Sequence, residues 1–226
     1  MMDAPRRWPA RPAVLVCLLA SALFAWSAAA ARAQEKEPLP LFAVDVQGAL
    51  PKLPTDEPVR SPRGLGVGTL PPWGPGVNLG AHVYPLRGRR MALGVGASVQ
   101  LVRGSRAPEA EKDSNTPPAG PTVTTRFRAF SPQASLNFGH RRGWSYLSAG
   151  IGRSSLTISR DDALEEEAQG VSTINWGGGG RWFAKEHLAF SFDVRIYRLS
   201  ELAPSTLSAG HPAMNLLVLN VGISLK

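Results

Sequence analysis

The residues from 188 to 199 alternate between two kinds of side chain without a break, and this pattern limits the possible folds more than any other. One face would carry Leu188, Phe190, Phe192, Val194 and Ile196, and the other Ala189, Ser191, Asp193, Arg195 and Tyr197. A period of two predicts a β-strand, because successive side chains point to opposite faces of a sheet. In a soluble sheet the apolar face meets the core. In a membrane barrel it meets lipid, and the polar face lines a closed interior.

The rest of the chain favours the barrel. Alternation of this kind predicts eight strands, at residues 41–50, 76–86, 91–103, 123–138, 144–158, 171–183, 188–199 and 214–226. Long connections follow the first, third, fifth and seventh strands, and short turns follow the others, so all long loops fall at one end. A soluble sandwich has no reason to sort its loops in this way. The sequence therefore predicts an all-β, eight-stranded antiparallel up-and-down transmembrane β-barrel with short periplasmic turns and long outer loops. The alternation shifts near Pro132, which predicts a bulge or bend there.

The first 33 residues have the pattern of a secretory signal peptide. Arg6, Arg7 and Arg11 precede an apolar run, and Ala31-Arg32-Ala33 supplies the small-x-small pattern of a cleavage site. We therefore expect a cleaved signal at 1–33, a short lead at 34–40 and a barrel at 41–226. Cleavage would remove Cys17, the only cysteine, which excludes disulfides and thiol chemistry from the exported chain. No later segment has the ~20 consecutive apolar residues of a membrane helix, so strands would have to span any membrane.

Two groups of side chains are candidate functional features of this barrel. The polar strand faces predict an interior network that includes Asp45, Arg181, Asp193, Arg195 and Tyr197. A dry interior requires such charges to pair and to form hydrogen bonds. Aromatic residues near the short turns predict a girdle at the boundary between lipid and water, formed by Phe138, Trp144, Tyr146, Trp182 and Phe183. Ordinary core aromatics at hairpin ends are the alternative for this second group.

No motif in the sequence predicts an enzyme, a cofactor or a metal site. The run Trp176-Gly177-Gly178-Gly179-Gly180 lacks the Lys-Ser/Thr of a phosphate loop, and no helix pattern follows it. The four histidines do not have the spacing of metal ligands. A Ser–His pair such as Ser98 with His82 would be needed for a lipid-modifying hydrolase, and the sequence gives it no orienting partner. The acidic residues between 161 and 167 are expected to form a solvated loop.

Four features of the chain resemble a known family. They are the signal sequence, the Gly-rich alternating strands, the stretch from 177 to 195 and the closing segment from 217 to 226. The chain resembles the small outer-membrane β-barrel proteins of the OmpA-like and porin-like superfamily, without a peptidoglycan-binding domain. The resemblance implies the outer membrane of a Gram-negative-type bacterium and insertion by the barrel assembly machinery. One departure is the last residue, Lys226, where many such barrels end in an aromatic residue that this machinery reads.

The expected function is a non-enzymatic structural or surface-interaction role carried by the loops. The expected partners are outer-membrane lipid and lipopolysaccharide, with no nucleic acid, and the barrel is expected to be a monomer. Two alternatives stay open from the sequence. One is a narrow channel for small solutes, and the other is a soluble periplasmic barrel whose apolar faces point inward around an apolar ligand.

Overall fold

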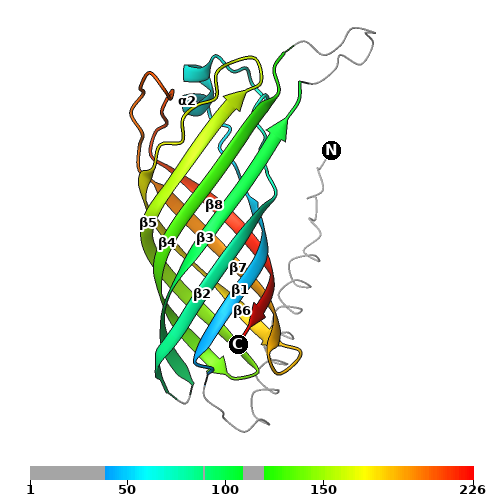
Figure 1. The fold of residues 1–226 in the computed structure, drawn as a ribbon, viewed down its shortest axis with the longest axis vertical. Coiled ribbons are helices and arrows are strands. Elements are labelled where there is room, and N and C mark those ends of the chain that lie inside the picture. The colour runs from blue at the N-terminus through cyan, green and yellow to red at the C-terminus, as the bar shows by residue number, and fades with distance from the viewer. Residues whose placement is uncertain (1–38, 89, 109–119) are drawn as a thin grey trace, which may run out of the picture. The chain divides into compact units, whose positions relative to one another are not determined.

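The computed structural model describes residues 39–88, 90–108 and 120–226. The predicted signal peptide at 1–33 and residues 34–38 of the predicted lead lie outside this range. The described chain forms one closed barrel in which β1 to β8 follow each other in sequence order and β8 pairs with β1 (Figure 1). All neighbouring strands are antiparallel. The strands are β1 Phe42–Pro51, β2 Gly76–Arg87, β3 Met91–Arg106, β4 Val123–His140, β5 Gly143–Arg160, β6 Val171–Phe183, β7 Leu188–Leu199 and β8 Met214–Leu225.

The predicted fold is confirmed, with eight strands and the predicted order of long and short connections. The main difference concerns length at the long-loop end. There β3 and β5 extend to Arg106 and Arg160, a few residues beyond the predicted ends at 103 and 158. The antiparallel ladder between β3 and β4 holds to the last of these residues, with Arg106 opposite Val123. The apolar alternation weakens in this part, which is why the sequence pattern underestimates the strands.

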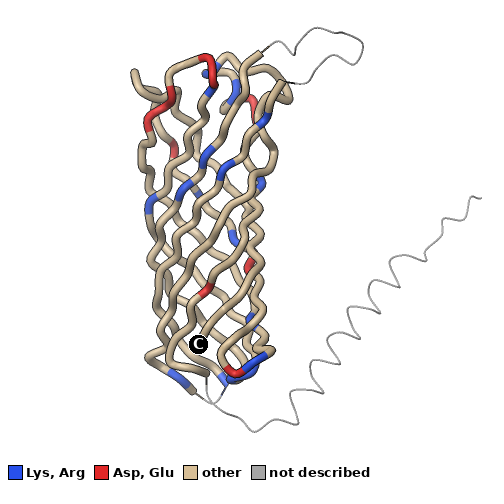
Figure 2. Tube along the Cα trace, turned by 45° about the vertical axis from the view of Figure 1, so that its right-hand side comes forward, with Lys and Arg blue, Asp and Glu red and all other residues tan. Residues whose placement is uncertain are grey.

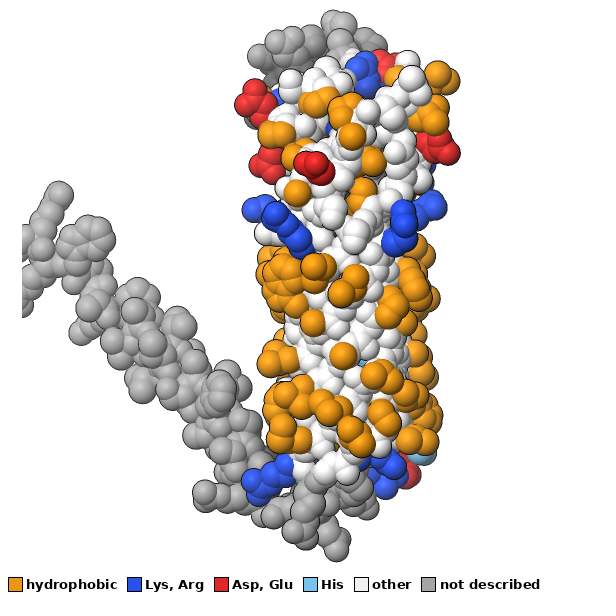
Figure 3. All heavy atoms as spheres, turned by 90° about the vertical axis from the view of Figure 1, so that its left-hand side faces the viewer, with side chains coloured by type: hydrophobic (Ala, Val, Ile, Leu, Met, Phe, Trp, Pro, Cys, Tyr) orange, Lys and Arg blue, Asp and Glu red, His pale blue; other side chains and the backbone are white. Residues whose placement is uncertain are grey.

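The strand faces point as a membrane barrel requires. In β7, Phe190 and Val194 are about half exposed on the outside, whereas Asp193 and Arg195 are buried inside. Outward apolar residues on β1 run from Phe42 to Leu50, which corresponds to about 20 Å along the axis of a barrel with strands tilted by about 40°. Figure 3 shows apolar side chains covering the lower and middle part of the wall. Along this part of the wall the apolar faces point outward, so the soluble alternative with inward apolar faces is wrong for it.

Toward the long-loop end the two faces exchange character. In β4, Phe127 and Ala129 face inward and are buried, whereas Arg128 is exposed on the outside. This exchange explains the shift of alternation near Pro132 without a bulge, because the register of β4 with β3 is continuous through that residue. The ladder between β4 and β5 lacks the pairs at Ser131 and Pro132 but resumes in the same register, so the bulge, of the predicted bulge or bend, is wrong. The register instead shifts between Val83 and Leu86 of β2, on either side of Pro85, which has no N–H to donate to the ladder.

The connection from 52 to 75 contains the only helical turns among the described residues. They are the short helix α2, Glu57–Arg60, and the 3₁₀ helix η1, Ser61–Arg63. Pro58 and Pro62 lie in the first turns of these two elements, where a missing N–H costs nothing. No helix in the described part of the chain is long and apolar enough to cross a bilayer. Figure 1 shows α2 at the end of the barrel where the long loops gather.

Candidate functional site

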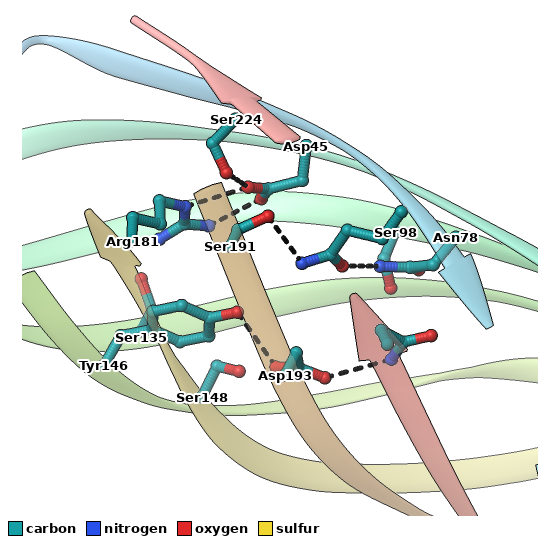
Figure 4. Close-up of polar contacts among 12 residues, drawn as sticks. Asp45, Asn78, Ser98, Ser135, Tyr146, Ser148, Arg181, Ser191, Asp193 and Ser224 are labelled. Atoms are coloured by element: carbon teal, nitrogen blue, oxygen red, sulfur yellow. Dashed lines mark hydrogen bonds and ion pairs between the residues drawn. The ribbon is translucent and has the colours of Figure 1, made fainter. Parts of the chain in front are cut away.

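A polar network occupies the middle of the barrel interior. Arg181 of β6 donates from Nε to Asp45 Oδ1 at 2.8 Å and from Nη2 to Asp45 Oδ2 at 2.5 Å, and Ser224 of β8 also donates to this carboxylate. The two charged side chains are only 1% and 5% exposed. The Arg181 guanidinium also lies 4.3 Å from the ring centre of Tyr146. Figure 4 shows Arg181 pointing across the interior to Asp45. The bidentate geometry compensates two charges that burial alone would make costly.

A second ion pair lies beside the first. Arg195 donates from Nη2 to Asp193 Oδ2 at 2.9 Å, and both residues come from β7. The remaining donors of Arg195 reach Asn175 at 2.7 Å and Ser148 at 2.7 Å. Tyr146 donates its hydroxyl hydrogen to Asp193 at 3.0 Å (Figure 4). Each carboxylate thus has its own guanidinium, and the network carries no net charge.

Apolar layers close the interior on both sides of this network. Toward the long loops, Tyr197 packs edge-on against Phe127 with ring centres 5.4 Å apart, and neither ring is exposed to solvent. Toward the short turns, Trp144 stacks on Phe183 at 5.0 Å. The upper layer, toward the long loops, consists of Ala49, Leu53, Val102, Phe127, Ala129, Leu156, Val171, Tyr197, Leu199, Leu216 and Val218. The lower layer, toward the short turns, consists of Leu39, Ala43, Tyr84, Ala92, Trp144 and Tyr146. The interior of an eight-stranded barrel is just wide enough for such side chains to fill.

Three of the long loops, at 52–75, 161–170 and 200–213, form a cap over the upper layer. Arg63, at the end of η1, forms a nearly buried ion pair with Glu166 of the 161–170 loop at 2.9 Å. Arg63 also donates to the Gly210 carbonyl at 3.0 Å, and Glu166 accepts from the Ala209 N–H at 3.3 Å. One ion pair thus ties three loops together. The sequence reading of the acidic segment as solvated is wrong for Glu166, because its partner is about a hundred residues away in the chain and no local pattern reveals it.

The predicted girdle divides between the two faces of the wall. Phe138 and Trp182 point outward, 38% and 52% exposed, and Trp182 stacks on Phe192 at 5.3 Å. Trp144 and Tyr146 are 3% and 5% exposed and face the interior, so the prediction that they belong to an external girdle is wrong. The physical reason is the parity of β5, in which Ser145 and Leu147 are the outward residues. Phe183 packs against the lower interior layer as well.

The histidine and serine considered for catalysis do not form a pair. Ser98 accepts a hydrogen bond from Gln133 Nε2 at 2.6 Å, and neither ring nitrogen of His82 has a hydrogen-bond partner within the described residues. Over the same residues, no group of three or more His, Cys, Asp or Glu side chains is arranged to hold a metal ion.

A ring of basic side chains borders the apolar part of the wall on its upper side. Its five members are all exposed and occur on five different strands or their ends: Lys52, Arg103, Arg128, Arg153 and Arg198. On each strand, the basic residue is the first outward residue that follows the last outward apolar residue in the direction of the long loops. Arg128 follows Phe130 on β4 in this way, and Arg153 follows Ile151 on β5. Figures 2 and 3 show basic residues at this height, above the apolar surface and below the loops. We call this set the basic belt. It was missed in the sequence because its members are far apart in the chain.

Comparisons with known proteins support the architecture. A scan against protein-family models finds no match, and a search of curated proteins finds none. Among solved structures, the chain is similar to Neisserial surface protein A (NspA), with 12% identity, 83% of this chain and 97% of that chain covered, and a TM-score of 0.55. It is also similar to Ail, the attachment invasion locus protein of Yersinia pestis, with 14% identity, coverage of 84% and 99%, and a TM-score of 0.47. The closed eight-stranded topology and the likeness to NspA show that the chain has the fold of the small outer-membrane β-barrels that its sequence resembles.

Proposed function

We propose that this protein is a sealed, non-enzymatic outer-membrane barrel of a Gram-negative-type bacterium, exported by its signal peptide and inserted by the barrel assembly machinery. Its role is structural or lies in surface interactions carried by the loop cap. The observation that carries the proposal is the exchange of the two strand faces at the basic belt. Below the belt the outer wall is apolar and encloses the polar network, whereas at and above the belt the outside of β4 carries Arg128 and Arg126 while Phe127 lies inside.

This exchange indicates two different solvents along one barrel. Lipid surrounds the lower part, because the exposed band of Val, Leu, Ile and Phe, about 20 Å tall on β1, is close to the ~25 Å apolar band of outer-membrane barrels. Water surrounds the upper part, which therefore has the apolar core of a soluble barrel. Outer-membrane barrels place their long loops outside the cell, so the cap held by Arg63 and Glu166 would face the exterior. A loop end tied together in this way presents a fixed surface to a partner.

Orientation is testable because the described chain contains no cysteine. Leu164 is 97% exposed in the loop from 161 to 170, and Lys185 is exposed in the short turn between β6 and β7. A membrane-impermeant maleimide added to intact cells should label Leu164→Cys at once. It should label the matched variant Lys185→Cys only after the outer membrane is permeabilised. Labelling of both variants in intact cells, or of Lys185→Cys alone, would contradict the proposed placement.

The channel alternative has its own test. The apolar layers around Tyr197 and Trp144 leave those side chains at most 3% exposed, so the filled interior should pass no ions. The purified protein in a planar bilayer should give no steady conductance, measured against a known porin as a positive control. Stable single-channel steps at neutral pH would favour a narrow channel over the sealed barrel.

A further inference from the structure

A pocket of about 320 Å³ interrupts the basic belt on the outside of the wall, between β3, β4, β5 and the end of the loop that precedes β6. Val99 and Leu101 of β3 and Phe130 of β4 supply its apolar lining, and Arg128 and Arg153 supply its charged lining. Ala168 and Gly170 of the loop complete it. We propose that this pocket binds a phosphate group of lipid A, the phosphorylated and acylated anchor of lipopolysaccharide in the outer leaflet.

The two guanidinium groups are placed to bind one anion together. Arg153 is the register partner of Phe130, so Arg128 is its diagonal neighbour on the same face of the sheet. Diagonal neighbours of this kind have Cα atoms about 7–8 Å apart, which two long side chains can bridge around one phosphate. Arginine suits this task because its planar, always charged fork donates two parallel hydrogen bonds to phosphate oxygens.

No carboxylate of the described residues pairs with either arginine. Arg128 has no hydrogen bond or ion pair within the described residues, and Arg153 donates only to the Gly170 carbonyl, at 2.7 Å. The next outward residue of β4 behaves differently, because Arg126 forms an ion pair with Glu165. Among the described residues, a carboxylate therefore pairs with the arginine above the pocket and none pairs with the two arginines that line it. That bond to Gly170 fixes one donor of Arg153 and leaves the others free to bind an anion.

The apolar side of the pocket selects an amphipathic ligand over a soluble anion. Leu101 and Phe130 are 45% and 54% exposed and continue into the lipid-facing wall. A lipid whose phosphate meets the arginines can lay its acyl chains along these side chains without leaving the bilayer. A volume near 320 Å³ is at the lower end of ligand pockets, so it accepts a phosphorylated part of a headgroup and not a whole lipid.

Lipid A fits better than a phospholipid for reasons of position and charge. The inference rests on the proposed outer-membrane placement, in which the belt lies at the outer leaflet. Lys52, Arg103 and Arg198 continue the same belt around the wall, so neighbouring lipids also meet basic side chains. A lipid with two phosphates per molecule can bind the pocket and still interact with the next basic residue, whereas phosphatidylglycerol carries a single phosphate.

The test measures lipid retained by the folded protein in zwitterionic micelles, by native mass spectrometry, with three probes. These are diphosphorylated lipid A, the same lipid after enzymatic removal of its phosphates, and phosphatidylglycerol. The variant is Arg128→Gln with Arg153→Gln. The matched control is Arg90→Gln with Arg142→Gln, which removes the same charge from exposed residues at the short turns. Loss of two charge-assisted contacts should weaken lipid A retention about 100-fold, and the control should bind like the wild type.

Three results would overturn the inference. Equal loss in the control variant would mean that overall charge holds the lipid, and equal retention of dephosphorylated lipid A would mean that acyl contacts alone do so. Equal retention of phosphatidylglycerol, lost in the same variant, would assign the pocket to phospholipid. Each sample is also run unheated and boiled on a gel, because a closed barrel migrates differently when folded. Absence of this shift in the wild type would contradict the proposed membrane barrel itself, whereas a normal shift with unselective binding contradicts the lipid A site alone.

Discussion

The ion pair between Asp45 and Arg181 should be the most sensitive point of the interior. Replacing Arg181 with Met keeps an unbranched side chain of similar length and removes the charge. Asp45 would then keep its hydrogen bond from Ser224 but lose both hydrogen bonds from the guanidinium, in a site where its side chain is 5% exposed. Breaking a buried pair from one side costs about 3–5 kcal/mol, because the remaining charge stays buried without compensation. We therefore expect Arg181→Met to lower the free energy of unfolding by that amount.

A second substitution separates this mechanism from simple loss of packing. Asp45→Asn with Arg181→Met removes both charges, so no isolated carboxylate remains. The double variant should be more stable than Arg181→Met alone, because replacing both charges of a buried pair is often close to neutral. Unfolding would be followed in urea, with the protein in lipid vesicles, by tryptophan emission and by the gel shift between folded and unfolded barrel. A double variant as unstable as the sum of the two single variants would refute the argument, as would a cost below about 1 kcal/mol for Arg181→Met.

Three further predictions concern the wall and the cap. Leu147→Arg puts a charge on the lipid face and should cost about 2–4 kcal/mol in the same unfolding assay, against about 0–1 kcal/mol for Ser155→Arg beyond the belt; equal costs would contradict the position of the apolar band. Glu166→Gln weakens the ion pair to Arg63 and should speed proteolysis of the loops about 10-fold, whereas the exposed control Glu167→Gln should leave the rate unchanged. The hydrogen bonds from Arg160 hold the pKa of Asp162 below its ordinary value, so this pairing is complete at neutral pH and is lost only as the pH falls through that lowered pKa. An NMR titration of the Asp162 carboxyl with a midpoint above the usual Asp range would contradict this.

The strand pattern could be predicted because it depends on neighbouring residues. Leu188 to Leu199 alternates at a period that only a strand produces, and its bounds in the structure are the predicted ones. The placement of Asp45 and Arg181 inside the barrel followed from the same parity, since both occur on polar faces. The specific pairing between them did not follow, because β1 and β6 are not adjacent in the barrel.

The errors have a common physical origin. Trp144 and Tyr146 were assigned to the outside because barrels place aromatics near their ends, and the parity of β5 turns them inward instead. Near Pro132 the alternation changes because the apolar face of β4 is the outer one before the belt and the inner one beyond it, as the proposed change from lipid to water requires. The alternation of a strand indicates which of its two faces is apolar. Whether that face is the outer or the inner one depends on whether lipid or water surrounds the strand at that height. The basic belt depends on the register of all strands and could not be found from any single segment.

The carboxylate of Asp45 also affects how the barrel assembles. Its partners come from β6 and from β8, with Ser224 separated from it by 179 residues in the chain. Until the first and last strands meet, Asp45 and Arg181 lie on an open sheet, and neither can be buried without the other. A half-closed barrel inside the bilayer would expose both charges to lipid, which is unfavourable by several kcal/mol. We therefore expect closure of the seam and completion of the interior to occur in one step. An intermediate that enters the membrane before the ends meet would lack the ion pair that stabilises the finished barrel.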